Sequence, residues 1–160
     1  MKDLVACAEK IAKLLTERKQ TIAIAESSTG GLISAALLAV PGASAYFLGG
    51  GVVYTRQSRR VLFDVPDAAL AGLRPSTEAY ALLMARTAQK SFSSTWALTE
   101  TGATGPTCNR YGDAAGHSCI AVAGAAEGSM TLETGISDRQ ENMHAFTIAA
   151  LTFLLNAISR

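Results

Sequence analysis

The sequence contains few charged residues and no excess of either sign. Charged residues make up 17% of the 160 residues, and 14 Lys and Arg against 13 Asp and Glu give a formal net charge of +1. Nucleic-acid binding depends on basic side chains that neutralise many phosphates, so this composition argues against a nucleic-acid partner. No apolar run reaches the roughly 20 residues that span a membrane, and the first residues lack signal-peptide order. We therefore expect a soluble, cytoplasmic protein that does not bind membranes.

Metal ligands are equally scarce. The three cysteines, Cys7, Cys108 and Cys119, and the two histidines, His117 and His144, share no metal-ligand spacing. We expect no metal site. Cys7 and Cys119 are expected to be small buried residues, and His117 is expected to be a solvent-exposed side chain in a polar loop.

Three common nucleotide-binding and hydrolase motifs are absent. The chain has no phosphate-binding P-loop, no dinucleotide fingerprint after Gly49–Gly51, and no Gly-x-Ser-x-Gly turn. These absences argue against a P-loop enzyme, a Rossmann cofactor site and a serine hydrolase of the usual kind. We expect no organic cofactor.

Apolar residues make up 49% of the chain, enough for one domain of residues 1–160 with a large core. Hydrophobic periodicity and turn signals predict the elements in order. Helices are expected over 3–18, from 32 to near 40, over 56–62, after a cap at Ser76 (with Ala79, Leu82, Leu83 and Arg86 on successive turns), and after a capping box at 137–140 (with Met143, Phe146, Ala150, Phe153, Leu154 and Ala157 inward). Strands are expected over 21–25, 47–55 and 95–99, followed by an antiparallel pair over 118–123 and 129–134. This alternation predicts an α/β fold, a three-layer α/β/α sandwich with a central mixed sheet.

A polar turn joins the first strand to the next helix. Residues 26–31 read Glu-Ser-Ser-Thr-Gly-Gly, directly before an apolar helical run. The free N–H groups at such a helix start form an anion-binding site for a phosphate or carboxylate. The alternative is an ordinary helix cap, in which Ser28 or Thr29 satisfies the first N–H groups.

Three polar turns are expected to converge on one edge of the sheet. Ser27, Thr55 and Thr101 each lie close after an apolar strand, and the carboxyl ends of parallel strands collect ligands. We therefore expect one pocket for an anionic ligand. A hydroxyl nucleophile also needs a base, yet no lysine occurs between Lys19 and Lys90. The apolar-rich helices and low charge also lead us to expect a homo-oligomer.

Five blocks in order make the chain recognisable. They are Ala25–Gly31, Val40–Phe47, Gly51–Thr55, Thr101–Pro106 and Gly135–Arg139. Together they resemble the C-terminal domain of the competence/damage-inducible protein CinA, the nicotinamide mononucleotide deamidase family. The resemblance covers nearly the whole chain, and it is to the stand-alone form of this domain.

The resemblance implies hydrolysis of the carboxamide of nicotinamide mononucleotide to nicotinate mononucleotide and ammonia, without a metal, by a serine–lysine dyad. The serine matches Ser44. Ser27 and Tyr54 match further catalytic positions, and Arg139 suits bidentate phosphate binding. The remaining substrate-binding positions are Ser28, Thr29, Gly30, Gly31, Thr101, Gly102 and Gly105.

The chain departs from the family pattern at the dyad lysine, which is Arg59 here. Arg56 and Thr107 also stand where the family usually carries other residues. A guanidinium stays protonated and is unsuited to act as a general base, so Arg59 is left with stabilising negative charge. Two hypotheses follow: an amidohydrolase, or a catalytically impaired paralogue that binds a pyridine nucleotide or phosphate metabolite. A plain interaction module is a third reading, which predicts neither binding nor turnover.

Overall fold

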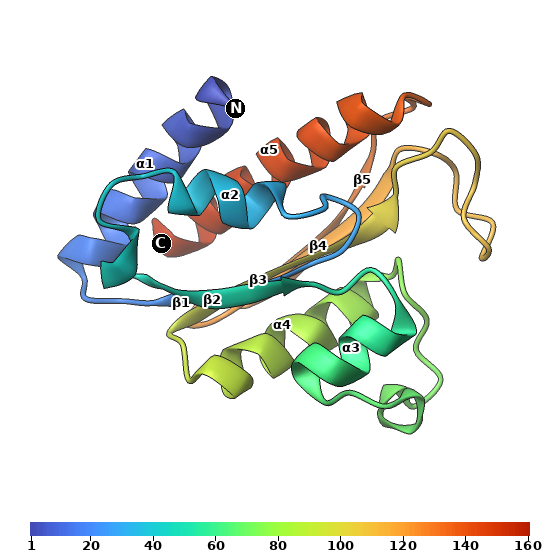
Figure 1. The fold of residues 1–160 in the computed structure, drawn as a ribbon, viewed down its shortest axis with the longest axis horizontal. Coiled ribbons are helices and arrows are strands. Elements are labelled where there is room, and N and C mark those ends of the chain that lie inside the picture. Colours follow the sequence, from blue (N-terminus) through green and yellow to red (C-terminus); the bar gives the residue numbers. More distant parts are fainter.

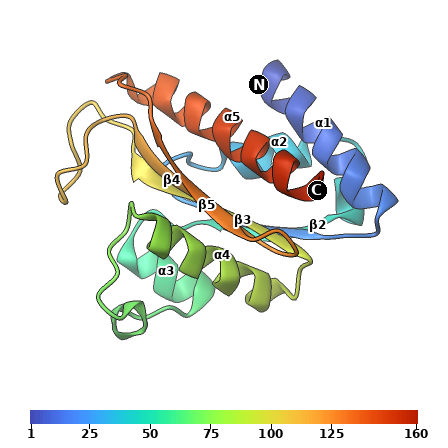
Figure 2. The ribbon, with the colours of Figure 1, turned by 180° about the vertical axis from the view of Figure 1, so that it is seen from behind.

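A computed structural model describes residues 1–160, and it has three layers (Figures 1 and 2). The strands are β1 (Ile22–Glu26), β2 (Phe47–Val52), β3 (Trp96–Ala103), β4 (His117–Ala123) and β5 (Gly128–Glu133). The helices are α1 (Lys2–Glu17), α2 (Leu32–Leu38), α3 (Arg56–Phe63), α4 (Glu78–Phe92) and α5 (Arg139–Ile158), with short 3₁₀ turns η1 (Ala43–Ala45) and η2 (Asp67–Leu70). The predicted α/β sandwich is confirmed.

The sheet is mixed, in the order β2-β1-β3-β4-β5. Strand β1 pairs in parallel with both β2 and β3, whereas β3–β4 and β4–β5 are antiparallel. The carboxyl ends of β1, β2 and β3 therefore lie at one edge of the sheet, as expected. No helix is both long and apolar enough to cross a bilayer.

Helices cover both faces of the sheet (Figures 1 and 2). The face under α1, α2 and α5 buries a cluster of 21 residues, and the face under α3 and α4 buries one of 15. Successive side chains of a strand point to opposite faces and so enter different clusters: Ile24 and Leu98 belong to the first, Ala25 and Ala97 to the second. A strand buried on both faces reads as a continuous apolar run, which is why β1 was predictable.

Strand β2 contains an irregularity at its glycines. Ile22 pairs with Phe47 and Ala23 with Gly49, so the register shifts between them. A Cβ on Gly50 would lie 2.8 Å from the carbonyl oxygen of Ile24, so this position requires glycine for close approach of the two strands.

Several predicted boundaries are wrong. Strand β3 continues to Ala103, so Glu100 and Thr101 lie within the strand and not in a turn after it. Thr77, not Ser76, caps α4, because its side chain reaches the N–H of Tyr80. Asp138 caps α5 through the N–H of Glu141, in place of the predicted box that opened one residue earlier.

The inward faces of two helices also differ from prediction. Helix α4 buries Tyr80, Ala81, Met84, Ala85 and Ala88, while the predicted Ala79 and Arg86 are exposed. The predicted Leu82 and Leu83 are half-buried and pack against the same cluster as Tyr80 and Met84, so the predicted stripe is wrong only at Ala79 and Arg86. In α5, Phe146, Ala150, Leu154 and Ala157 are buried as expected, while Met143 and Phe153 are half-buried.

Substituting Gly50→Ala should destabilise the protein by about 1–3 kcal/mol, because the methyl group collides with the backbone of Ile24. Urea unfolding of both variants measures this. Gly128→Ala, at a strand position where a Cβ meets only Phe153 at 3.7 Å, is the matched control. Equal midpoints for the two variants would contradict the close approach.

Candidate functional site

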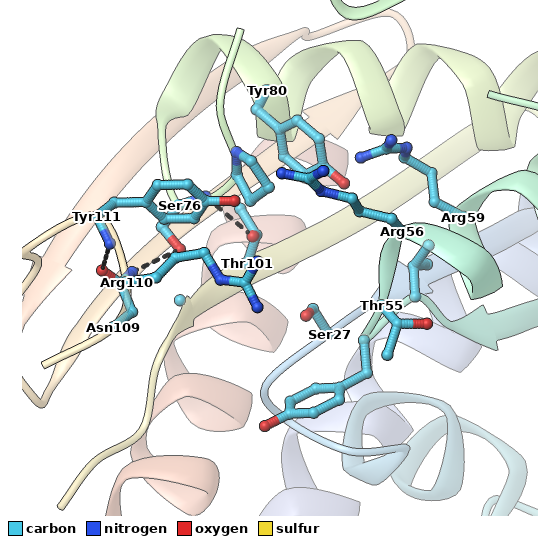
Figure 3. A pocket seen from close by; sticks show the side chains of 14 residues that line it. Ser27, Thr55, Arg56, Arg59, Ser76, Tyr80, Thr101, Asn109, Arg110 and Tyr111 are labelled. Carbon is cyan, nitrogen blue, oxygen red and sulfur yellow. Dashed lines mark hydrogen bonds between the residues drawn. The ribbon is translucent and has the colours of Figure 1, made fainter. Parts of the chain in front are cut away.

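A cavity of about 370 Å³ opens at the carboxyl edge of the parallel strands, on the face covered by α3 and α4 (Figure 3). Its walls come from the ends of β1 and β2, from α3 and α4, from β3, and from two loops. The lining residues are Ser27, Val53, Tyr54, Thr55, Arg56, Arg59, Pro75, Ser76, Tyr80, Thr101, Gly102, Asn109, Arg110 and Tyr111. The predicted convergence of Ser27, Thr55 and Thr101 is therefore present.

Ser27 lines the cavity just after β1, and it is half-buried (Figure 3). Its N–H donates to Oε2 of Glu100 at 3.2 Å, which fixes the backbone. Its Oγ makes no hydrogen bond within the protein and lies at the cavity surface. Ser27 is thus available to a ligand.

The start of α2 is occupied by a carboxylate of the protein itself. Glu26 is fully buried and accepts from the N–H groups of Gly31 (3.0 Å), Ile33 (3.1 Å) and Ser34 (3.0 Å). It also accepts from the hydroxyls of Thr29 and Ser34, both at 2.6 Å. The predicted anion-binding site is therefore filled by a carboxylate of the chain itself, so these N–H groups are not available to an external phosphate. The alternative that Ser28 or Thr29 caps the helix is wrong, because the N-cap is Gly31.

Glu100 holds the same loop from β3. It accepts from the Thr29 N–H at 3.0 Å, from the Ser28 hydroxyl, and from the Ser118 hydroxyl at 3.2 Å. Burial raises the pKa of Glu100, and the hydrogen bonds from Ser28, Thr29 and Ser27 oppose this rise. Ser28 and Thr29 are buried on these carboxylates, and neither they nor Gly30 and Gly31 line the cavity. The structure therefore does not place these four at the ligand.

Ser44 lies at the opposite edge of the sheet. It is exposed in η1, just before β2, and the first residue of β2 pairs with Ile22 at the start of β1. Ser27 and Thr101 lie toward the other ends of parallel strands. The structure does not bring Ser44 to the cavity, which argues against its role as nucleophile there. Strand direction is the signal that separates them: Ser44 precedes a parallel strand, whereas Ser27 follows one.

Arg59 lines the cavity but is held by the protein. Its side chain is 2% exposed, Nε donates to the carbonyl oxygen of Val65 at 3.0 Å, and Nη2 pairs with Asp67. Burial raises the pKa of the neighbouring Tyr80, and the Arg59 guanidinium opposes that rise. Arg59 is thus held in place by the protein, and its guanidinium group has no free lone pair with which to accept a proton.

Tyr54, Gly105 and Arg139 meet at the rim. Arg139 donates from Nη1 to the carbonyl oxygen of Gly105 at 3.0 Å and from Nη2 to the Tyr54 hydroxyl at 3.2 Å. Thr101 and Gly102 line the cavity, and the Thr101 hydroxyl accepts from the Ser76 N–H at 3.2 Å. These predicted residues are brought together, although Gly105 and Arg139 themselves do not line the cavity.

The sequence predicts a polar loop before β4, but sequence reasoning missed that Asn109, Arg110 and Tyr111 of this loop line the cavity. Asn109 Oδ1 accepts from the N–H groups of Tyr111 (2.9 Å) and Asp113 (3.0 Å), a side-chain-stabilised turn that presents Arg110 to the cavity. Asp113 pairs with both terminal nitrogens of Arg74, at 2.7 and 3.0 Å. The sequence Asn-Arg-Tyr-Gly-Asp at residues 109–113 was the available signal for an ordered turn.

His117 is not a loop residue, and its side chain is only 12% exposed. It begins β4, with Nδ1 paired to Glu133 and Nε2 at 2.9 Å from the carbonyl oxygen of Ser76. Cys119 Sγ lies 3.6 Å from Nε2, but both ring nitrogens already have oxygen partners and burial raises the pKa of this thiol. This group therefore anchors the cavity wall at Ser76 and is no cysteine–histidine nucleophile pair. Cys119 is buried as expected, while Cys7 is half-buried.

Fold and site together define a three-layer α/β protein with an arginine-lined pocket at the carboxyl edge of its parallel strands. The family model of the CinA C-terminal domain matches residues 4–158, so the chain belongs to the CinA C-terminal domain family. A CinA-like protein of Chlorobaculum tepidum is 34% identical over 156 residues, 94% of this chain and 37% of the relative. One from Chlorobium limicola is 34% identical over 148 residues, 89% of this chain and 34% of the relative. The chain thus spans about a third of the length of these curated relatives.

Solved structures agree with the fold. The competence/damage-inducible protein CihA of Agrobacterium tumefaciens has a TM-score of 0.87 at 28% identity, covering 99% of this chain and 96% of that one. The competence damage-inducible protein A of Klebsiella pneumoniae has a TM-score of 0.90 at 22% identity, covering 98% of each chain, which shows likeness of fold alone.

The charge on His117 should make stability depend on pH. Burial disfavours the imidazolium, but Glu133 and the Ser76 carbonyl outweigh it and raise the pKa of His117. The stabilisation is therefore fully present below the unfolded pKa of about 6.5 and is lost as pH rises through the folded pKa. The difference in unfolding free energy between wild type and His117→Asn should be largest near pH 6 and smaller at pH 9. Glu133→Gln should shrink this pH dependence, and a difference that grows toward pH 9 would contradict the assignment.

Proposed function

We propose that this chain binds a pyridine mononucleotide, with nicotinamide mononucleotide as the leading candidate, and that its hydrolysis of the carboxamide is impaired. A cavity of about 370 Å³ is within the range of small-molecule sites, roughly 300–1,000 Å³. Tyr80 and Tyr111 offer aromatic surface for a planar ring, and Arg56 and Arg110 offer positive charge for a phosphate. Membership of the CinA C-terminal domain family supports a pyridine nucleotide as the class of ligand.

One observation supports impaired hydrolysis: the base that a lysine would supply is missing from the cavity. Arg59 occupies the position of the family's lysine and is locked by Asp67 and Val65. No lysine, histidine or carboxylate is among the lining residues. Loss of a general base typically slows such a reaction by about 10²–10⁴-fold.

An active amidohydrolase is the second candidate, and the free Ser27 hydroxyl favours it. In that reaction Ser27 Oγ attacks the carboxamide carbon, its proton passes to the departing nitrogen, and ammonia leaves. Water then hydrolyses the acyl-enzyme to nicotinate mononucleotide and restores the serine. We assign this role to Ser27 because Ser44 lies at the other edge of the sheet.

Calorimetric titration with nicotinamide mononucleotide, paired with an ammonia assay on the same sample, separates the two candidates. We expect binding, with ammonia release no faster than that of Ser27→Ala. Replacing Arg59→Lys together with Asp67→Asn should raise release by about 10²-fold or more, because a lysine freed of its carboxylate partner can lose its proton.

Arg60→Lys is the matched control, since Arg60 is exposed on the same helix and does not line the cavity. Wild-type ammonia release that falls to background in Ser27→Ala would establish the active enzyme instead. Absence of binding would overturn the nucleotide assignment.

A further inference from the structure

The charges inside the cavity are unbalanced. Three arginines line it, and no acidic residue does. Arg59 is neutralised by Asp67, and Arg56 lies 3.8 Å from the same carboxylate with 65% of its side chain exposed, a weak pair. Arg110 makes no ion pair and no hydrogen bond within the protein, so its charge is uncompensated.

Arg110 and Arg56 enter the cavity from opposite walls. In Figure 3 the Arg110 side chain extends from its loop toward Ser27 and Thr101, while Arg56 extends from α3 toward Tyr80. Arg59 lies beside Arg56 on the same helix. An anion between the walls would meet two guanidinium groups that no protein acid fully occupies.

The backbone that carries Arg110 is fixed, although its side chain is free. On one side Asn109 Nδ2 donates to Asp113 at 2.8 Å and to the Ser76 hydroxyl at 3.3 Å. On the other side the guanidinium carbon of Arg74 lies 5.2 Å from the centre of the Tyr111 ring. The bidentate pair of Arg74 with Asp113 ties the loop to the segment before α4. Such a loop presents a cation at low ordering cost on binding.

We propose that Arg110, assisted by Arg56, is the phosphate subsite of this pocket, selective for a ligand that ends in a phosphomonoester dianion. Guanidinium groups bind phosphate oxygens in bidentate fashion, and a dianion uses both charges where a carboxylate uses one. Family resemblance implies Arg139 as the phosphate-binding residue, but two of its N–H groups already donate to Gly105 and Tyr54. This subsite rests on the proposed function only for the identity of the base attached to the phosphate.

Calorimetry with three probes tests the subsite: nicotinamide mononucleotide, nicotinamide riboside, which lacks the phosphate, and inorganic phosphate. Wild type should bind the mononucleotide at least about 10-fold more tightly than the riboside. Arg110→Gln should weaken mononucleotide binding by about 10- to 100-fold, as expected for a charged hydrogen bond, and leave riboside affinity within about twofold. Arg56→Gln should weaken it in the same direction by less. Arg60→Gln, which removes the same charge from α3 outside the cavity, should change neither affinity.

The outcomes separate this proposal from the proposed function. Equal affinity of wild type for mononucleotide and riboside, or a phosphate preference removed by Arg139→Gln and not by Arg110→Gln, overturns the subsite while the nucleotide assignment stands. Binding of inorganic phosphate that depends on Arg110, with neither pyridine ligand bound, supports the subsite and overturns the nucleotide assignment. No binding of any probe overturns both.

Discussion

Two buried carboxylates organise the site. Glu26, at the end of β1, and Glu100, within β3, are each at most 1% exposed, and together they take the polar groups of the turn between β1 and α2. The Thr29 hydroxyl joins them, at 2.6 Å from Glu26 and 3.2 Å from Glu100. Two adjacent buried acids are costly unless they are densely hydrogen-bonded, and this turn supplies the donors.

This arrangement decides what remains for a ligand. The N–H groups at the start of α2 are used by Glu26, so they offer nothing to an external phosphate. Positive charge at the cavity comes instead from arginine side chains on α3 and on the loop before β4. Glu26 and Glu100 bind the polar groups of the turn, whereas the Ser27 side chain lines the cavity with a free hydroxyl. Glu26 thus fills the predicted anion site, and the Ser27 hydroxyl remains available to a ligand.

The architecture was predictable because hydrophobic periodicity reports it directly. Strand β1 is apolar up to Glu26, the β4–β5 pair is antiparallel across a short turn, and parallel pairing followed from the intervening helices. The site was predictable in part: strand direction indicated Ser27, and family resemblance indicated Tyr54 and Arg59, all of which line the cavity. The hydrogen-bond partners of the polar side chains could not be predicted, because a sequence does not show whether Thr29 faces a ligand or a buried acid.

Two further failures have physical causes. The buried role of Glu100 was missed because a glutamate after an apolar run reads as the start of a turn, whereas here the strand continues through it. Ser44 was chosen by resemblance against strand direction, and its position before β2 places it at the amino edge. Arg110 gave no signal of its own, because its placement depends on contacts of Asn109 and Asp113 with distant residues.

The hold of Glu26 on the turn is tested most directly by amide hydrogen exchange in Glu26→Gln. A glutamine offers one acceptor oxygen and turns an N–H₂ group toward the same donors, so their hydrogen bonds weaken. The N–H groups of Gly31, Ile33 and Ser34 should exchange at least about 10-fold faster than in wild type, while those of β4 keep their protection. Glu9→Gln, at an exposed position of α1, should leave all of them unchanged. Wild-type protection of the three amides in Glu26→Gln would contradict the account.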